Sequence, residues 1–197
     1  MSVIKIIIGS TRPQRFGIQV GKWVAGIAEE VAATSGGSVK FELVDLAEVN
    51  LPLLDEPVPP AMNQYQNEHT KKWSETVAGG DGFVMITPEY NHSTSAALKN
   101  ALDYVFYEWN YKPVGFVSYG SGAGGSRAVE HLRGIVGELK MYDLRESVMV
   151  PNYWGQLGPD GSFKPMDEQT AGLKAMFAQL IYWTDAMKPA REKLAAK

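Results

Sequence analysis

Two arginines follow a Gly-Ser-Thr triplet near the start of the chain, in the segment Gly9-Ser10-Thr11-Arg12-Pro13-Gln14-Arg15-Phe16-Gly17. The apolar run over 4–8 before it is typical of a buried strand, and an amphipathic helix is expected to begin near Phe16. Unpaired backbone N–H groups and the positive end of the helix dipole converge at such a junction. Together with Arg12 and Arg15, these groups predict a site for a phosphate carrying about two charges.

An ordinary strand-to-helix turn with two solvated arginines is the alternative interpretation of this segment, since such turns are common. A P-loop is excluded. That motif requires a lysine directly after the second glycine of G-x-x-x-x-G-K-[ST], and no lysine follows a glycine at that spacing.

A second polar loop, Pro88-Glu89-Tyr90-Asn91-His92-Ser93, follows the apolar run over 82–87. Its backbone N–H and C=O groups suit the polar edge of a heterocycle, and Tyr90 offers an aromatic ring to pack nearby. His92 has two interpretations: it lines the opening of a substrate site, or it is an exposed loop histidine.

A third loop, Gly120-Ser121-Gly122-Ala123-Gly124-Gly125, formally matches G-x-G-x-x-G. Its context argues against a dinucleotide site, because it follows the fourth strand and Pro151 stands where an acidic residue is expected. Glycines here would let N–H groups approach the edge of a flat ring, with a helix N-terminus behind them that favours negative charge. The alternative is that the glycines serve tight packing alone.

Composition limits the possible classes of protein. With 197 residues, 45% of them hydrophobic and 21% charged, the chain is expected to fold as one α/β domain over 1–197. The net charge of -3 argues against a nucleic-acid partner. The absence of cysteine excludes disulfides, thiolate nucleophiles and cysteine-based metal sites. The first apolar run is too short for a signal peptide or membrane span, so a cytoplasmic protein without a membrane partner is expected.

Apolar periodicity predicts the regular elements. Strands are expected over 4–8, 41–45, 82–87, 114–118 and 147–150, and helices after residue 16, over 63–78, and around 98–105, 128–139 and 173–181. Four prolines predict a loop over 46–60, anchored by Leu51, Leu53 and Leu54. Asp160-Gly161 predicts a small hairpin or extended arm within 152–165. The last helix is expected to fray near Pro189, leaving 192–197 mobile.

Strands that alternate with helices predict a doubly wound parallel sheet with helices on both faces. The first, third and fourth strands are the most apolar and should be central, which gives the flavodoxin-like order 2-1-3-4-5. In such a sheet ligands bind beyond the carboxyl ends of the strands, where the first and third strands diverge. The three polar loops are expected to meet there.

The sequence resembles the NADPH-dependent FMN reductase family, a flavodoxin-like group that also contains azo, quinone and chromate reductases. The resemblance rests on four pieces in family order: residues 9–12, the loop 88–93, Ala97-Leu98-Lys99-Asn100-Ala101-Leu102-Asp103, and the stretch 118–125. Many members have Ser-x-Pro-Gly where this chain has Ser93-Thr94-Ser95-Ala96, and some have Ser and Asn at the positions of Arg15 and Gly17.

The resemblance implies a bound FMN and the residues around it. Its phosphate would be surrounded by residues of the first loop, namely Ser10, Thr11, Arg12, Arg15, Phe16 and Gly17. Its isoalloxazine would be bordered by Pro88, Glu89, Tyr90 and Asn91, with Ser93 close by. Its other edge would be lined by Ser118, Tyr119, Gly120, Gly122, Ala123 and Gly124. Glu89 is expected to be a structural acceptor, because hydride transfer through a flavin needs no protein base. No catalytic side chain and no metal are expected.

The implied function is that of an NAD(P)H oxidoreductase. A hydride would pass from NAD(P)H to FMN and then to a flavin, quinone, azo compound or similar acceptor at the same face, by a ping-pong mechanism, with the loop glycines' N–H groups stabilising the reduced ring. An electron carrier like flavodoxin, without turnover of its own, is the alternative, although a net charge of -3 is mild for one. A flavin-free regulatory or scaffold relative is a third possibility.

Five aromatic residues crowd the end of the third helix: Tyr104, Phe106, Tyr107, Trp109 and Tyr111. One buried face of a helix cannot hold them all. We therefore expect a homo-oligomer interface there, in a dimer or tetramer, as is frequent in the resembling family.

Overall fold

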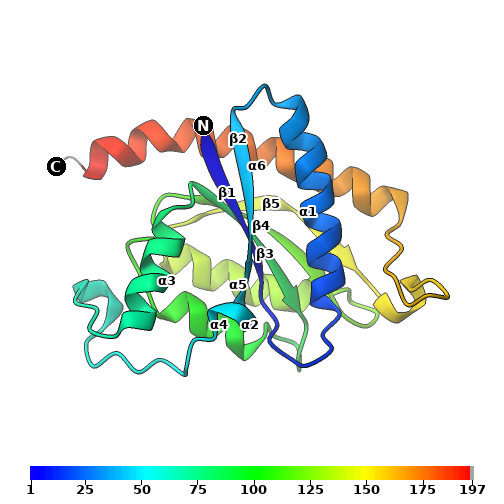
Figure 1. Ribbon diagram of the computed structural model, residues 1–197, viewed down its shortest axis with the longest axis horizontal. Helices are drawn as coiled ribbons and strands as arrows, with labels where there is room; N and C mark the ends of the chain where they lie inside the picture. Colours follow the sequence, from blue (N-terminus) through cyan, green and yellow to red (C-terminus); the bar gives the residue numbers. More distant parts are fainter. Residues whose placement is uncertain (196–197) are drawn as a thin grey trace.

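The computed structural model describes residues 1–195. A parallel sheet of order β2-β1-β3-β4-β5 forms its centre (Figure 1). The strands are Ser2–Ile8 (β1), Val39–Asp45 (β2), Gly82–Pro88 (β3), Pro113–Tyr119 (β4) and Tyr142–Val150 (β5). This order, with every neighbouring pair parallel and β2 and β5 at the edges, confirms the predicted topology.

Helices cover both faces of the sheet (Figure 1). Helices α1 (Gly17–Thr34) and α6 (Asp167–Ala195) pack on one face, and α3 (Glu68–Ala78), α4 (Ala96–Asp103) and α5 (Ser126–Glu138) pack on the other. The shorter elements are α2 (Leu46–Val49) and two 3₁₀ turns, η1 (Pro60–Met62) and η2 (Tyr153–Gln156).

Alternation along the central strands builds two separate cores. Ile6 and Ile8 of β1 point to the α1/α6 side, whereas Ile7 between them points to the α3/α4/α5 side. Both faces are apolar, because helices cover both, and every residue of β3 and β4 is buried. The sheet therefore holds its carboxyl edge, and the loops that leave it, in a fixed position.

The stretch between β2 and α3 differs from the prediction. Helix α2 begins directly after β2 because the Asp45 carboxylate accepts the Ala47 N–H at 3.0 Å. Of the three expected anchors only Leu51 packs against the core, whereas Leu53 is 81% exposed and Leu54 42%. Helix α3 begins at Glu68 rather than near residue 63, since the Glu56 carboxylate accepts the N–H groups of residues 66 and 67, each at 2.9 Å.

The predicted ranges of the last strand and the last helix were shorter than the elements in the structure. Strand β5 runs over nine residues instead of four. Its first half carries the charged residues Asp143, Arg145 and Glu146, which are half-buried or exposed. Helix α6 continues past Pro189 because Lys188 and Arg191 both bind the Asp81 carboxylate, at 2.9 and 2.5 Å. Of the end expected to be mobile, 192–195 is helical and 196–197 lies outside the described residues. The expected hairpin is present, closed by a bridge between Leu157 and Phe163.

Candidate functional site

The three polar loops meet at the carboxyl edge of the sheet. Ser10 in the loop after β1 and Tyr90 in the loop after β3 are joined through their hydroxyl groups at 3.1 Å. The Glu89 N–H donates to the Tyr119 carbonyl at 3.0 Å, which joins the loops after β3 and β4. Ser95, the cap of α4, donates its hydroxyl to the Gly9 carbonyl. The sequence therefore located the meeting point of the loops correctly.

The loop after β1 offers a group of free donors. The backbone N–H groups of Ser10, Thr11 and Arg12 donate to no acceptor among the described residues. They lie just before the N-terminus of α1, where the helix dipole adds positive potential. Such a group of donors is suited to an anion.

The two arginines of this loop have different surroundings. Arg12 is exposed, forms no ion pair among the described residues, and its guanidinium lies 5.8 Å from the centre of the Tyr90 ring. Arg15 is largely buried and forms an ion pair with Asp45, whose side chain is only 9% exposed. Arg12 therefore carries the uncompensated charge of the loop, and Arg15 ties the loop to the start of α2.

Phe16 is buried in the core among other aromatic rings. Its ring is 6% exposed, stacks on Tyr153 with 4.5 Å between ring centres, and contacts the edges of Tyr119 and Phe163. Its role in the structure is to join the start of α1 to the hairpin over 152–165. Gly17 follows it, and a Cβ there would lie 2.8 Å from the Tyr119 hydroxyl.

The Tyr119 hydroxyl is a buried polar group without a hydrogen-bond partner in residues 1–195. Burial raises the pKa of Tyr119 above its usual range, so the hydroxyl stays protonated and can donate. An unpaired buried donor costs free energy. Its place, under Gly17 at the start of α1, points to a ligand acceptor group close to the free N–H groups.

The loop after β3 is a tight turn. Pro88 is the buried last residue of β3, paired with Tyr119 of β4. Tyr90 and Ser93 exchange two backbone hydrogen bonds of 2.9 and 3.0 Å. Between them Asn91 and His92 are exposed, with φ angles of +50° and +68°. Two consecutive left-handed residues are typical of a type I′ turn, and they hold the loop in one shape.

Glu89 is held by an arginine that the sequence analysis did not identify. The Glu89 side chain is 7% exposed and accepts from Nε of Arg127, in the first turn of α5, at 2.6 Å. Its second carboxylate oxygen is buried and has no partner in the described part of the chain. The expected role of Glu89 as a structural acceptor agrees with this pairing.

The loop after β4 is shaped by its glycines. Gly124 and Gly125 have φ angles of +60° and +89°, and a Cβ at Gly125 would lie 2.6 Å from that of Ser118. Ser118 is fully buried and donates its hydroxyl to the Gly124 carbonyl at 2.8 Å. The loop's remaining N–H groups find no acceptor within residues 1–195, namely those of Ser121, Gly122, Ala123 and Gly125. The glycine-rich loop is thus a second set of free donors, of which Ser121 and Gly122 are exposed.

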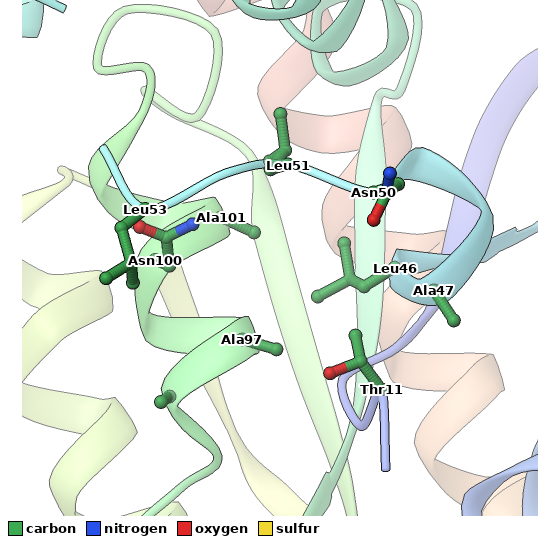
Figure 2. A pocket seen from close by; sticks show the side chains of 10 residues that line it. Thr11, Leu46, Ala47, Asn50, Leu51, Leu53, Ala97, Asn100 and Ala101 are labelled. Atoms are coloured by element: carbon green, nitrogen blue, oxygen red, sulfur yellow. The ribbon is translucent and has the colours of Figure 1, made fainter. Parts of the chain in front are cut away.

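A cavity of about 450 Å³ lies next to the first loop (Figure 2). Thr11 and Leu46 lie on one side of it, and Ala97 and Ala101 of α4 on the other. None of its ten lining residues is charged. Thr11 lines this cavity and also carries one of the free N–H groups. Because the lining has no positive charge, the cavity is suited to a neutral ligand group and not to a phosphate.

Sequence reasoning missed two partners in this region, Asp45 and Arg127. Only Asp45 had a local signal, since Asp45-Leu46-Ala47-Glu48 has the spacing of a helix-capping sequence. No group of three or more acidic or histidine side chains within residues 1–195 is placed to hold a metal ion. No helix of that part is long and apolar enough to cross a bilayer.

Comparison with known proteins identifies relatives of this chain. A model of the NADPH-dependent FMN reductase family matches residues 1–155. An NAD(P)H-dependent FMN reductase of Schizosaccharomyces pombe is 41% identical over 140 residues, covering 70% of this chain and 67% of the relative. An NADPH azoreductase of a Bacillus species is 31% identical over 170 residues, covering 83% of this chain and 86% of the relative.

A solved structure supports the fold. The flavoenzyme NAD(P)H:(acceptor) oxidoreductase FerB from Paracoccus denitrificans superposes with a TM-score of 0.69 at 21% identity, over 95% of this chain and 99% of that chain. The family match extends over the three loops at the carboxyl edge and all five strands. The chain therefore belongs to the NADPH-dependent FMN reductase family and is an NAD(P)H-dependent oxidoreductase, not a carrier without turnover of its own.

Proposed function

We propose that this NAD(P)H-dependent reductase binds FMN across the three loops, with the phosphate at the loop after β1. The observation that carries the proposal is the uncompensated charge of Arg12 beside the free N–H groups of Ser10 and Thr11 at the start of α1. The unpaired Tyr119 hydroxyl supplies a further donor at the same place. This donor set fits a phosphate and the ribityl chain next to it.

The ring would lie between the other two loops. On this proposal the turn Tyr90–Ser93 borders one side, and the N–H groups of Gly122 and Ala123 border the other. Bound FMN would supply the hydride-transfer chemistry. The chain's part is to orient the ring, leave one face open, and stabilise negative charge on the reduced ring through the glycine-rich loop. Pro88 and Ser118 support the site as the buried ends of β3 and β4.

The proposed reaction has two half-reactions at one open face. NAD(P)H would bind at this face, deliver a hydride and leave, and an acceptor of the flavin, quinone or azo class would then take its place. Steady-state plots at several acceptor concentrations should be parallel, and intersecting plots would contradict a shared site. A protein that neither contains nor binds FMN would overturn the whole proposal, and fluorescence quenching on addition of FMN to the apoprotein measures this directly.

We also propose a homo-oligomer, as the aromatic cluster predicted. Tyr104 and Trp109 of that cluster are fully buried in the core, but Tyr107 is 52% exposed. Its hydroxyl donates to the Ala61 carbonyl at 3.0 Å, and the Tyr104 hydroxyl donates to the Leu53 carbonyl at 3.3 Å. These bonds hold the segment between α2 and α3 against the end of α4, and exposed apolar side chains occur in both: Leu53, Leu54, Met62 and Tyr107. Exposed apolar side chains held in this way are typical of a subunit interface.

Sedimentation velocity at micromolar concentration tests this interface. The wild-type chain should sediment as a dimer or tetramer, and Leu53→Glu together with Met62→Glu should shift it toward the monomer. Leu43→Glu is the matched control, because Leu43 is 48% exposed but lies on the edge strand β2. A wild-type monomer would overturn the oligomer proposal without affecting the proposed FMN site.

A further inference from the structure

The turn that borders the proposed ring site is bonded to a histidine of α5. The hydroxyl of Ser93 and Nδ1 of His131 lie 3.0 Å apart. His131 is exposed, and both residues line a hollow of about 680 Å³ between α4 and α5. Ala96, Gly134 and Ile135 provide apolar surface in the same hollow. Ser93 therefore belongs both to the proposed ring site and to an open pocket large enough for a bicyclic molecule.

Most charged groups that face His131 are already paired. On α4, Lys99 binds Asp103 at 2.6 Å. On α5 itself, Glu130 binds Arg133 at 3.2 Å, and Arg127 is held by Glu89 of the turn. Glu138 lines a second hollow that His131 also lines, and it lies two helical turns further along α5.

His131 has only a neutral partner, the Ser93 hydroxyl. The other histidine nearby is His92, at the tip of the turn, whose side chain bonds to no described residue. Imidazole is the side chain that most readily gains and loses a proton at neutral pH.

The chemistry of a hydroxyl next to an imidazole suits proton transfer. A serine hydroxyl is both donor and acceptor, so it can give up its own proton and take one from Nδ1 in the same arrangement. The hydrogen bond to His131 thus survives either protonation state of the imidazole. A contact that only holds the turn in place does not need a side chain that can both donate and accept a hydrogen bond.

We propose that Ser93 and His131 form a proton relay that protonates the oxygen of a quinone-class acceptor, which binds at the open face of the ring with this oxygen in the hollow; the inference rests on the proposed function. The quinone gains two electrons and one proton as a hydride from the reduced cofactor, and a second proton from the Ser93 hydroxyl. Nδ1 of the His131 imidazolium returns a proton to Ser93, and the neutral imidazole takes one from water. The sum is quinone plus hydride plus proton giving hydroquinone.

Comparing the rates of two electron acceptors distinguishes the proton relay from hydride transfer. 2-Methyl-1,4-naphthoquinone consumes an additional proton, whereas oxidised thionicotinamide NADP accepts a hydride and needs none. The ratio of the quinone rate to the thionicotinamide rate should fall about tenfold or more in His131→Ala. It should fall equally in His131→Gln, because glutamine can still bond to Ser93 but cannot release a proton near neutral pH.

His69→Gln is the matched control, since it changes a histidine that binds Asp55 and lies on α3, away from the three loops. Its rate ratio should equal that of the wild-type holoenzyme. If His131→Gln also keeps the wild-type ratio, the pair only positions the turn and the relay is wrong. A ratio lowered by His92→Asn instead would assign the proton to His92. If the wild-type holoenzyme reduces neither acceptor, the proposed function itself fails.

A measurement without turnover gives a second readout. The chain has three histidines, so the imidazole resonances of histidine-labelled, FMN-loaded protein can be assigned with single variants. Adding the naphthoquinone without NAD(P)H should move the resonances of His131 and leave those of His69, which binds Asp55 beside α3. The shift at His131 should be smaller in Ser93→Ala. Unmoved His131 resonances at saturating quinone would show that the acceptor does not bind in this hollow, which overturns the inference.

Discussion

Arg15 and Asp45 form an ion pair in which the two side chains are 14% and 9% exposed. The pair joins the loop after β1 to the cap of α2, since the other oxygen of Asp45 accepts the Ala47 N–H. Two arginines that are three positions apart therefore have separate tasks. On the proposed function Arg12 would meet the ligand, while Arg15 maintains the loop through its ion pair with Asp45.

Replacement of the two arginines should have different effects. Arg12→Ala should weaken FMN binding by about 10- to 100-fold, the range for a lost charge-assisted hydrogen bond, with little change in the free energy of unfolding. Arg15→Met should instead lower the free energy of unfolding by about 3 kcal/mol, because it leaves the Asp45 carboxylate buried and unpaired. FMN titration and urea unfolding of both variants measure this.

The double variant Arg15→Met with Asp45→Asn is the control for the ion pair. It should recover most of the stability lost in the single variant, because no buried charge remains without a partner. Equal loss of FMN affinity in both single variants, with equal stability, would contradict the separate tasks.

The glycine-rich loop depends on Gly125. Its φ of +89° and the 2.6 Å approach of a Cβ to that of Ser118 predict that Gly125→Ala lowers the free energy of unfolding by about 2 kcal/mol or more. Gly122→Ala is the matched control, since no atom lies within 4 Å of a Cβ at that position. It should stay within about 0.5 kcal/mol of the wild type. Similar unfolding midpoints in urea for both variants would refute this account of the loop.

Lys112 should make stability depend on pH. Its ammonium group is buried and donates to the Val77 and Ala78 carbonyls at the end of α3, both at 3.1 Å. Burial, and then the charge of Arg191, lower the pKa of Lys112 from 10.5 to about 7. Between these values the unfolded chain binds more protons than the folded one, so the free energy of unfolding rises with pH across that window.

The lysine contribution can be isolated by comparison with Lys112→Met. From pH 7.5 to pH 9 the wild type should gain ~2 kcal/mol relative to the variant, at 1.36 kcal/mol per pH unit. Urea unfolding at both pH values measures the difference. Parallel pH dependence in the two proteins would mean that the folded lysine keeps its ordinary pKa.

Asp81 should hold the last turns of α6. It binds Lys188 and Arg191 on either side of Pro189, a residue that costs a helix interior about 3 kcal/mol. Asp81→Asn should therefore increase amide hydrogen exchange after Pro189 while exchange over 173–181 stays slow. Lys174→Met is the control, because it removes an exposed α6 ion pair, to Glu30, far from the proline. Unchanged exchange in Asp81→Asn would show that the helix needs no such support.

The sequence predicted the order of the strands because a central strand of a parallel sheet is more apolar than an edge strand. Ile6 and Val84 stand in uninterrupted apolar runs and are central, whereas Glu42 in β2 and Arg145 in β5 mark the two edges. The same rule explains why β5 was predicted too short. An edge strand tolerates charge along one side, so its polar half has no apolar signal.

Side-chain partners were beyond the reach of local patterns. Arg15 and Asp45 are 30 positions apart, and Glu89 and Arg127 are 38 apart, so only the folded sheet brings them together. From sequence, Arg15 was predicted to bind a phosphate, and Arg127 had no predicted role. Helix α2 is different, because its capping residue Asp45 comes directly before it in the sequence. The loop was predicted from four prolines, and the first of them comes only after the helix ends.

The stretch after residue 155 lies outside the family match, yet Phe163 packs on Phe16, and Leu173, Phe177 and Leu180 fill the core beneath α1. Removing the residues after 155 would take α6 from the face of the sheet that it shares with α1 and would expose that part of the core. We expect such a truncated product to precipitate on expression. The family model therefore ends before the part of the chain that completes the core, and cloning boundaries should include α6.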